Sequence, residues 1–326
     1  MCEDKIDIKE NRLLEWDKKL LSVLLKDKTT GRNLIWGTDI YRQYGLAYSS
    51  DSHIKPELVT GFKGNIIKPR VEKNKKEQLK RSRDKAEVFT PSWVCNAQNN
   101  LIDDAWLGYQ GAFNTEIQGG WITNSDKIIF PRKASRNWKS YVKANRLEIS
   151  CGEAPYITSR YDTVTGNYIQ VKERIGFLDR KLRVVSENTK SEEEWIYWAT
   201  RALKSVYGYD WQGDNVLLTR ENILYSLIDY YNECFEKKLE SQIILKFAKI
   251  IAWNIWQMDG LKYVVPNSCS KETIVIYSIF EEETITSSCL GCQKNNPHFH
   301  NGLYCKIMDW SAQKTIKFID LIEGDN

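Results

Sequence analysis

The sequence predicts an α/β protein with a mostly parallel, doubly wound sheet. Three short apolar segments read as strands, at 146–150, 206–211 and 254–261. They alternate with long segments of helical periodicity, at 191–206, 213–238 and 241–253. Strands that alternate with helices are typical of a parallel sheet, because each helical crossover returns the chain to the same end of the sheet. Ligands of such sheets bind beyond the carboxyl ends of the strands.

Two units are predicted along the chain. Residues 1–86 form a helical and basic extension, which begins with leucines at helical spacing between Leu13 and Leu25. Residues 87–326 form the α/β domain, with a Cys/His-rich insertion at 286–306. The chain has no run of eighteen apolar residues, and its N-terminus is polar and acidic. We therefore expect a cytoplasmic protein without a membrane span, whose eight cysteines are thiols or metal ligands.

Positive charge is concentrated between Lys63 and Lys85. The segment holds ten lysine and arginine residues against three acids, although the net charge of the whole chain is only +4. A basic stripe on a nearly neutral body is typical of a polyanion-binding surface. We expect nucleic-acid phosphates to contact Lys73, Lys75, Lys76, Lys80, Arg81 and Arg83. The alternative is a solvated helix face or a linker.

A small or acidic residue follows each predicted strand. Gly152 lies in the turn after the first strand, Asp210 ends the second, and Asp259 ends the third. A glycine lets a ligand approach the backbone closely. Asp210 could accept hydrogen bonds from ribose hydroxyls, and Asp259 could accept one from the exocyclic amine of adenine. The ordered set predicts a nucleoside pocket, although each residue alone is more often a helix cap or a turn residue.

Two motifs extend this pattern into a family resemblance. The segment 147–156, LEISCGEAPY, is similar to the cofactor motif L-E-P-[AS]-C-x-x-x-P-[FY] of amino-group DNA methyltransferases, with Ile149 in place of the first proline. The upstream segment Phe89-Thr90-Pro91, followed by Val94, resembles the family's [FY]-T-P-x-x-[LIV] motif. This motif order resembles that of the gamma class of adenine-N6 methyltransferases, which includes restriction endonuclease subunit M proteins.

The resemblance implies a Rossmann-like, S-adenosylmethionine-dependent methyltransferase fold and DNA as the partner. It also implies a cofactor site formed by Phe89, Thr90, Pro91, Glu148, Cys151, Gly152, Asp210 and Asp259. Methyl transfer would be achieved by aligning the target amine with the sulfonium methyl group. The sequence thus predicts a DNA adenine-N6 methyltransferase-like modification subunit of a restriction-modification system.

The catalytic motif of this family, [DNS]-P-P-[YFW], does not occur in the sequence. The nearest string is Asn296-Pro297-His298-Phe299, so Asn296, Pro297 and Phe299 are the candidate catalytic residues. The alternative is a non-catalytic or split subunit, which binds cofactor and DNA while a partner chain supplies the catalytic loop. A third reading is a zinc-stabilised interaction module that binds no cofactor.

The insertion contains a possible metal site. Cys289-x-x-Cys292 forms a knuckle, and His298, His300 and Cys305 follow within one returning segment. One of the two histidines, together with Cys305, could complete a tetrahedral zinc site with the two knuckle thiolates. Such a closed site would be structural. The alternative is a set of free cysteines in a surface hairpin.

Overall fold

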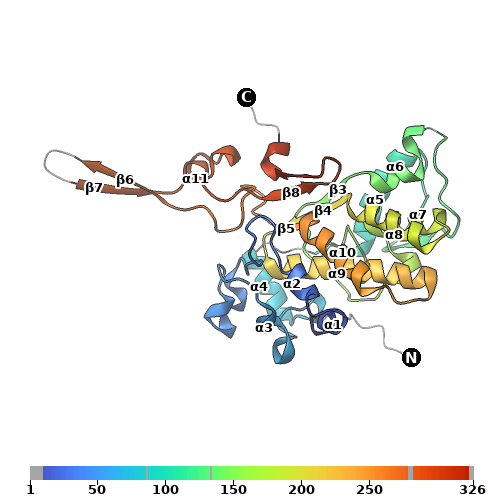
Figure 1. Cartoon of the computed structure of the whole chain (residues 1–326), viewed down its shortest axis with the longest axis horizontal. Coiled ribbons are helices and arrows are strands. Elements are labelled where there is room, and N and C mark those ends of the chain that lie inside the picture. The colour runs from blue at the N-terminus through green and yellow to red at the C-terminus, as the bar shows by residue number, and fades with distance from the viewer. Residues whose placement is uncertain (1–9, 86, 88, 133, 278–281, 323–326) are drawn as a thin grey trace.

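Three short parallel strands lie at the centre of the computed structural model, which describes residues 10–85, 87, 89–132, 134–277 and 282–322 (Figure 1). They are β3 (Arg146–Glu148), β4 (Val206–Asp210) and β5 (Ile255–Gln257), in chain order. The parallel α/β arrangement is therefore confirmed for the three predicted strands. Among the described residues the sheet has no further strand and no reversal of strand order, so a complete doubly wound sheet is not seen.

Four helices connect these strands. α7 (Phe177–Asn188) and α8 (Glu192–Leu203) lead from β3 to β4, and α9 (Gly213–Phe235) and α10 (Ser241–Asn254) lead from β4 to β5. Ser191 caps α8, because its side chain accepts a hydrogen bond from the backbone N–H of Glu194. Most of α9 is buried, which places it in the interior of the fold.

The two faces of the sheet pack against different parts of the chain. Val206 and Ile255 belong to the larger hydrophobic core, which they share with the connecting helices. Tyr209 and Trp256 point to the other face, with ring centroids 5.6 Å apart, and pack with Phe318 in a second, smaller core. The C-terminal segment therefore covers the face that the helices leave free.

The N-terminal part of the chain shares the larger core. Its helices and those that precede the sheet are α1 (Glu10–Trp16), α2 (Leu20–Leu24), α3 (Pro56–Val59), α4 (Lys75–Lys85), α5 (Ser92–Leu107) and α6 (Trp138–Lys143). The side-chain amide of Gln257 exchanges hydrogen bonds with the backbone of Ile35, at 3.0 and 2.9 Å. The extension is thus tied directly to β5, and one core contains side chains from both predicted units.

Three antiparallel hairpins complete the fold. They are β1 (Asn114–Ile117) with β2 (Gly120–Thr123), β6 (Glu272–Tyr277) with β7 (Glu282–Ser287), and β8 (Lys306–Asp309) with β9 (Lys314–Lys317). The β6–β7 hairpin extends away from the body, and α11 (Leu290–Lys294) lies at its base (Figure 1). Among the described residues, no helix combines the length and the apolar character needed to cross a bilayer.

A buried arginine on α9 connects the ends of two helices. The guanidinium group of Arg220 donates hydrogen bonds to the backbone carbonyls of Leu24, the last residue of α2, and of Lys26 just beyond it. It also donates to those of Ala252 and Ile255 at the end of α10. Helix carbonyls at these ends lack intrahelical donors and carry partial negative charge. Burial lowers the pKa of Arg220 to about 10, so the group stays protonated at neutral pH.

Replacing Arg220 with alanine should strongly destabilise the fold, because at least four buried carbonyl groups lose their donor. We expect the free energy of unfolding, measured by chemical denaturation, to fall by more than about 3 kcal/mol. The control variant Arg201→Ala removes an exposed arginine and should change the free energy by less than about 0.5 kcal/mol. A change below about 1 kcal/mol in Arg220→Ala would contradict this role.

Candidate functional site

The carboxyl ends of the three parallel strands meet at one edge of the sheet. Asp210 pairs with Gln257 across β4 and β5, and Asp259 follows two residues later. The backbone N–H of Gly152, in the turn after β3, donates a hydrogen bond of 3.0 Å to Asp210 Oδ2. The structure therefore places Gly152, Asp210 and Asp259 together at the predicted edge.

A cavity of about 1340 Å³ lies beyond these strand ends. Its walls include residues that follow each strand: Ile149 and Ser150 after β3, Trp211 and Gln212 after β4, and Asp259, Gly260, Leu261 and Lys262 after β5. The N-terminal loop at Gly37, Thr38 and Asp39 forms another wall. Gly37 has φ +76°, and a Cβ atom there would lie 2.7 Å from the backbone oxygen of Trp211. A glycine at position 37 is therefore what lets this loop close onto β4.

Asp210 lies behind the cavity wall and is only 7% exposed. Its Oδ1 accepts a hydrogen bond from the backbone N–H of Gln212 at 2.8 Å, while Oδ2 holds Gly152. Burial raises the pKa of Asp210 to about 6, and the backbone hydrogen bonds oppose this shift. The carboxylate thus joins the turn after β3 to the start of α9.

Asp259 contributes directly to the cavity wall. Its Oδ1 accepts hydrogen bonds from the backbone N–H groups of Leu261 and Lys262, at 3.0 and 3.2 Å. The ammonium group of Lys262 lies 3.6 Å from Oδ2. A carboxylate held in this way is oriented for a hydrogen-bond donor in the cavity.

Other residues of the predicted cofactor set have structural contacts. The carboxylate of Glu148 accepts the backbone N–H groups of Tyr156 and Ile157 at 3.3 and 3.0 Å, which fixes the chain after the turn. Burial raises the pKa of Glu148 well above its usual value. Cys151 is also buried, and its Sγ lies 3.7 Å from the hydroxyl of Thr219. Neither residue lines the cavity.

The predicted Phe89-Thr90-Pro91 loop packs behind the same turn. The ring of Phe89 lies 3.6 Å from the position that a Cβ atom would take at Gly152. The carbonyl of Thr90 accepts a hydrogen bond of 3.1 Å from Thr163, and Pro91 directly precedes α5. This loop is therefore next to Gly152, as the resemblance predicts, but it does not line the cavity.

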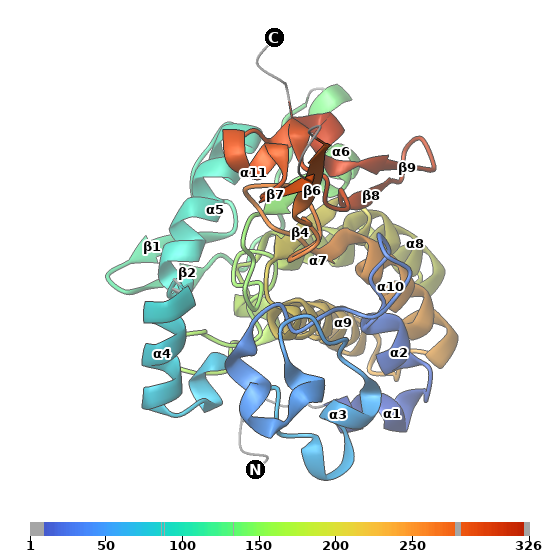
Figure 2. The same ribbon diagram turned by 90° about the vertical axis from the view of Figure 1, so that its left-hand side faces the viewer.

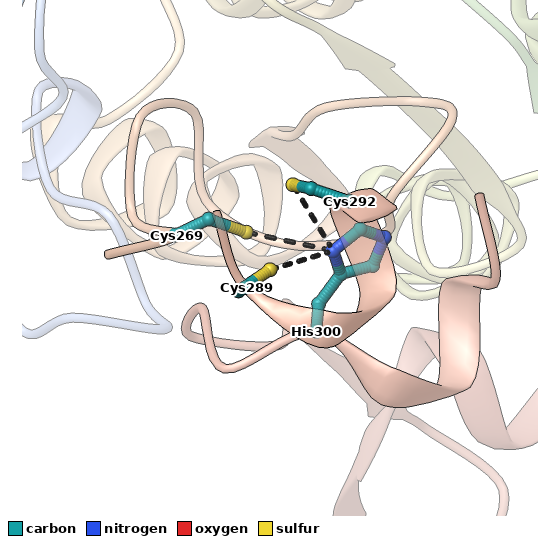
Figure 3. Close-up of side chains that lie close together, drawn as sticks. All are labelled: Cys269, Cys289, Cys292 and His300. Carbon is teal, nitrogen blue, oxygen red and sulfur yellow. Dashed lines mark hydrogen bonds between the residues drawn. The ribbon is translucent and has the colours of Figure 1, made fainter. Parts of the chain in front are cut away.

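The second candidate site is a cluster of three cysteines and one histidine (Figure 3). The Sγ atoms of Cys269, Cys289 and Cys292 lie 3.6, 3.5 and 3.7 Å from His300 Nδ1. The four candidate ligand atoms all lie within 4.8 Å of one another. Three thiolates and one imidazole are a donor set typical of closed, tetrahedral zinc sites. The cluster could therefore hold one metal ion.

Local contacts fix the histidine of this cluster. A Cβ atom at Gly291 would lie 2.6 Å from His300 Nδ1, so the glycine between the two knuckle cysteines leaves room for the ring. The backbone N–H of His300 donates to the hydroxyl of Tyr304 at 3.0 Å, and this hydroxyl donates to the Pro297 carbonyl at 2.7 Å. Such outer contacts orient a metal-binding ring.

The thiol pKa values also suit a cation. Burial raises the pKa of Cys289, but hydrogen bonds from the backbone N–H groups of Asn301 and Cys292 and from His300 outweigh it, and the pKa falls to about 6. Burial and the neighbouring thiols raise the pKa of Cys269. The neighbouring thiols thus oppose ionisation of Cys269, and a divalent cation would favour its thiolate form.

The ligand set differs from the one predicted by sequence. Cys305 lies outside the cluster, because it is fully buried in the smaller core with its Sγ 3.4 Å from the Gln257 carbonyl. His298 is exposed and also lies outside it. The fourth ligand is Cys269, which precedes β6. The β6–β7 hairpin returns the chain, so that Cys289 lies next to Cys269. No local sequence signal marked Cys269 as a ligand, because the β6–β7 hairpin that returns the chain to Cys289 was not predicted.

Two of the residues expected to contact nucleic acid are buried. Arg81 is 2% exposed and forms ion pairs with Glu87 and Asp214, the latter at 2.9 Å. Lys73 is 5% exposed and its ammonium group donates to the Lys68 carbonyl. The prediction was wrong for these two, because each neutralises or satisfies groups inside the fold. The other four, Lys75, Lys76, Lys80 and Arg83, are exposed on α4.

The candidate catalytic residues lie beside the metal cluster. Pro297 and Phe299 belong to a single 3-10 turn, and the Asn296 side chain accepts the backbone N–H of His298 at 2.9 Å. Phe299 is 52% exposed. None of Asn296, Pro297 and Phe299 lines the strand-end cavity.

Comparisons with protein-family models, with curated proteins and with solved structures found no match to this chain. The motifs and the geometry described above are therefore the basis for any proposed function.

We predict that the chain binds one equivalent of Zn²⁺ or Co²⁺, with thiolate-to-metal charge-transfer absorption in the cobalt form. Cys269→Ser should weaken binding at least about tenfold, because it removes one of four ligands. The matched variant Cys234→Ser changes an exposed cysteine outside the cluster and should bind normally. Normal binding by Cys269→Ser, together with loss in Cys305→Ser, would instead support the ligand set predicted from sequence.

Proposed function

We propose that this chain is an S-adenosylmethionine-binding protein of the DNA adenine-N6 methyltransferase type, which acts in the cytoplasm as a modification subunit of a restriction-modification system. The observation that carries the proposal is the cavity beyond the carboxyl ends of β3, β4 and β5. This is where parallel α/β sheets bind nucleoside ligands. The motifs around Gly152 and Phe89 supply the choice of cofactor.

Each strand end has a role in this proposal. The carboxylate of Asp259, on the cavity wall, accepts the exocyclic amine of the cofactor adenine. Asp210 does not line the cavity, but its Oδ2, which holds the Gly152 turn directly behind the wall, retains a lone pair for a ribose hydroxyl that enters between the wall and this turn. The Cys3His cluster holds structural zinc, since its four ligands leave no position open for a reacting group.

One observation favours the form of the proposal in which a partner chain supplies the catalytic loop. The target amine must meet an acceptor close to the cofactor methyl group. Asn296, the nearest equivalent of the family's catalytic residue, is used as a cap for His298 and lies outside the cavity wall. The chain would then bind cofactor and DNA, and transfer would require the partner.

Calorimetry with S-adenosylmethionine tests the cofactor site, and transfer of a labelled methyl group to DNA tests catalysis. Binding without transfer by the isolated chain supports the partner-dependent form. Transfer by the isolated chain would contradict that form, and lack of cofactor binding would contradict the proposal as a whole.

The variant Asp210→Asn should bind S-adenosylmethionine about 10- to 100-fold more weakly, because a charged acceptor is lost. The wild-type affinity should also depend on pH. With a pKa of about 6, Asp210 is ionised at pH 7 and mostly protonated at pH 5. The ionised form accepts the ribose hydroxyl, so the Kd should rise about tenfold between pH 7 and pH 5. Asp210→Asn should lack this component, and an identical pH profile in both proteins would contradict the assignment.

The exposed lysines of α4 should contact duplex DNA phosphates. In the triple variant Lys75→Ala/Lys76→Ala/Lys80→Ala, the slope of log Kobs against log salt should become shallower by about 3, since each contact contributes about 0.9. Fluorescence anisotropy with a labelled duplex measures this slope. An unchanged slope would mean that α4 is simply a solvated helix.

A further inference from the structure

A second basic surface, distinct from α4, lies where α2, α8 and α10 meet the β8–β9 hairpin. It is a cavity of about 640 Å³ whose walls include six lysines and two tryptophans: Lys19, Lys26, Lys28, Lys204, Lys246, Lys249, Trp253 and Trp310. We call these eight residues the lysine–tryptophan groove. No acidic residue lines this cavity within the described part of the chain.

An apolar cavity of about 430 Å³ continues the groove and shares Lys204 and Trp310 with it. Its interior includes Tyr207 and Phe318, and its rim adds three more cations, Lys143, Arg146 and Arg201. The one acidic residue among its described lining residues is Asp309, whose Oδ1 already accepts the backbone N–H groups of Ser311 and Ala312. Positive charge therefore surrounds an apolar depression.

Within the described part of the chain, none of the six lysines of the groove forms an ion pair with a carboxylate. Asp27 lies beside Lys28, but its carboxylate accepts the backbone N–H groups of Thr29 and Thr30. The groove thus presents a field of one sign to solvent, which attracts a polyanion.

The tryptophans hold two of these charges in place. The Lys204 ammonium lies 4.6 Å from the ring centroid of Trp310, and the Lys28 ammonium lies 5.7 Å from that of Trp253. Trp310 is itself fixed by a hydrogen bond of 2.7 Å from its indole N–H to Asn254. Cation–π contacts of this kind restrict long side chains, so part of the ordering needed to bind an anion is already present.

The pKa values of the same lysines indicate mutual repulsion. Burial, and then the charges of Arg220, Lys26 and Lys249, lower the pKa of Lys28. Burial, followed by Arg201 and Lys246, lowers that of Lys204. A bound anion would stabilise the protonated form of these lysines and so raise their pKa values.

We propose that the lysine–tryptophan groove binds single-stranded nucleic acid, with phosphates on the lysines and a base in the adjoining apolar cavity. The combination of a cationic track and an apolar, aromatic depression fits this ligand, because a single strand offers both charge and an unstacked ring. A duplex keeps its bases stacked and would leave the apolar cavity unfilled. This inference does not rest on the proposed cofactor site.

The groove is separate from the sites described above. Arg146 and Lys204 lie at or just before the amino ends of β3 and β4, so the groove is at the opposite edge of the sheet from the strand-end cavity. Figure 2 shows α4 on one side of the molecule and α2, α8 and α10 on the other. The two basic surfaces can therefore be tested independently.

The test compares two triple variants that remove the same charge. Lys26→Ala/Lys246→Ala/Lys249→Ala changes the groove, and Lys127→Ala/Lys190→Ala/Lys238→Ala removes three exposed lysines that lie outside both basic surfaces. Anisotropy of a labelled oligothymidine should show that the groove variant binds about 50-fold more weakly at roughly 0.15 M salt, with a salt slope shallower by about 2. The control variant should bind the single strand within about twofold of wild type. Thermal unfolding of each variant confirms that it is folded.

Three outcomes would overturn the proposal. Equal losses in both variants would mean that only net charge matters. Equal or tighter binding of polyphosphate of matched charge would mean that bases contribute nothing. Tighter binding to vesicles containing anionic lipid than to the oligonucleotide would assign the groove to a membrane surface. Calorimetry with S-adenosylmethionine on the groove variant reports separately on the cofactor site, so failure of one proposal can be distinguished from failure of the other.

Discussion

The guanidinium group of Arg220 is the contact on which most of the architecture depends. Among the described residues it forms no ion pair with a carboxylate, and it donates to backbone carbonyls from the ends of α2 and α10 and from Ile255 at the start of β5. A buried cation without such acceptors would be very costly. The same group therefore fixes the N-terminal segment, the helix before β5 and β5 itself relative to α9. Both the strand-end cavity and the lysine–tryptophan groove use elements held in this way.

Each face of the small central sheet, and each end of its strands, is in contact with a different part of the molecule. Beyond the carboxyl ends, Asp259 and the loop at Gly37 line the larger, strand-end cavity. At the amino ends, Arg146 and Lys204 lie beside an apolar one. Because side chains alternate along each strand, Tyr209 and Trp256 are free to pack under the C-terminal segment while their neighbours face the helices. Short strands are sufficient here since packing on both faces supplies the stability.

The sequence was informative where the signal is local. The parallel strands, their order of appearance and the meeting of Gly152 with Asp210 follow from periodicity and from strand ends. Contacts between residues far apart in the sequence could not be predicted. Nothing in the local sequence distinguishes Arg81, which neutralises Asp214 inside the fold, from an exposed arginine on the same helix. Likewise nothing in the local sequence shows that the fold buries Cys305 in the smaller core and brings Cys269 next to Cys289 and Cys292.

The position of the Cys3His cluster in the chain has a mechanical consequence. Cys269 precedes β6 and Cys289 follows β7, so both roots of the projecting hairpin are anchored to the same point (Figure 1). Cys269, Cys289 and Cys292 also line the strand-end cavity. A cation bound by the cluster would crosslink both ends of the β6–β7 hairpin. It would fix the orientation of the hairpin and the shape of one wall of the strand-end cavity together. Occupancy of this one site would then change both the position of the hairpin and the shape of the cavity.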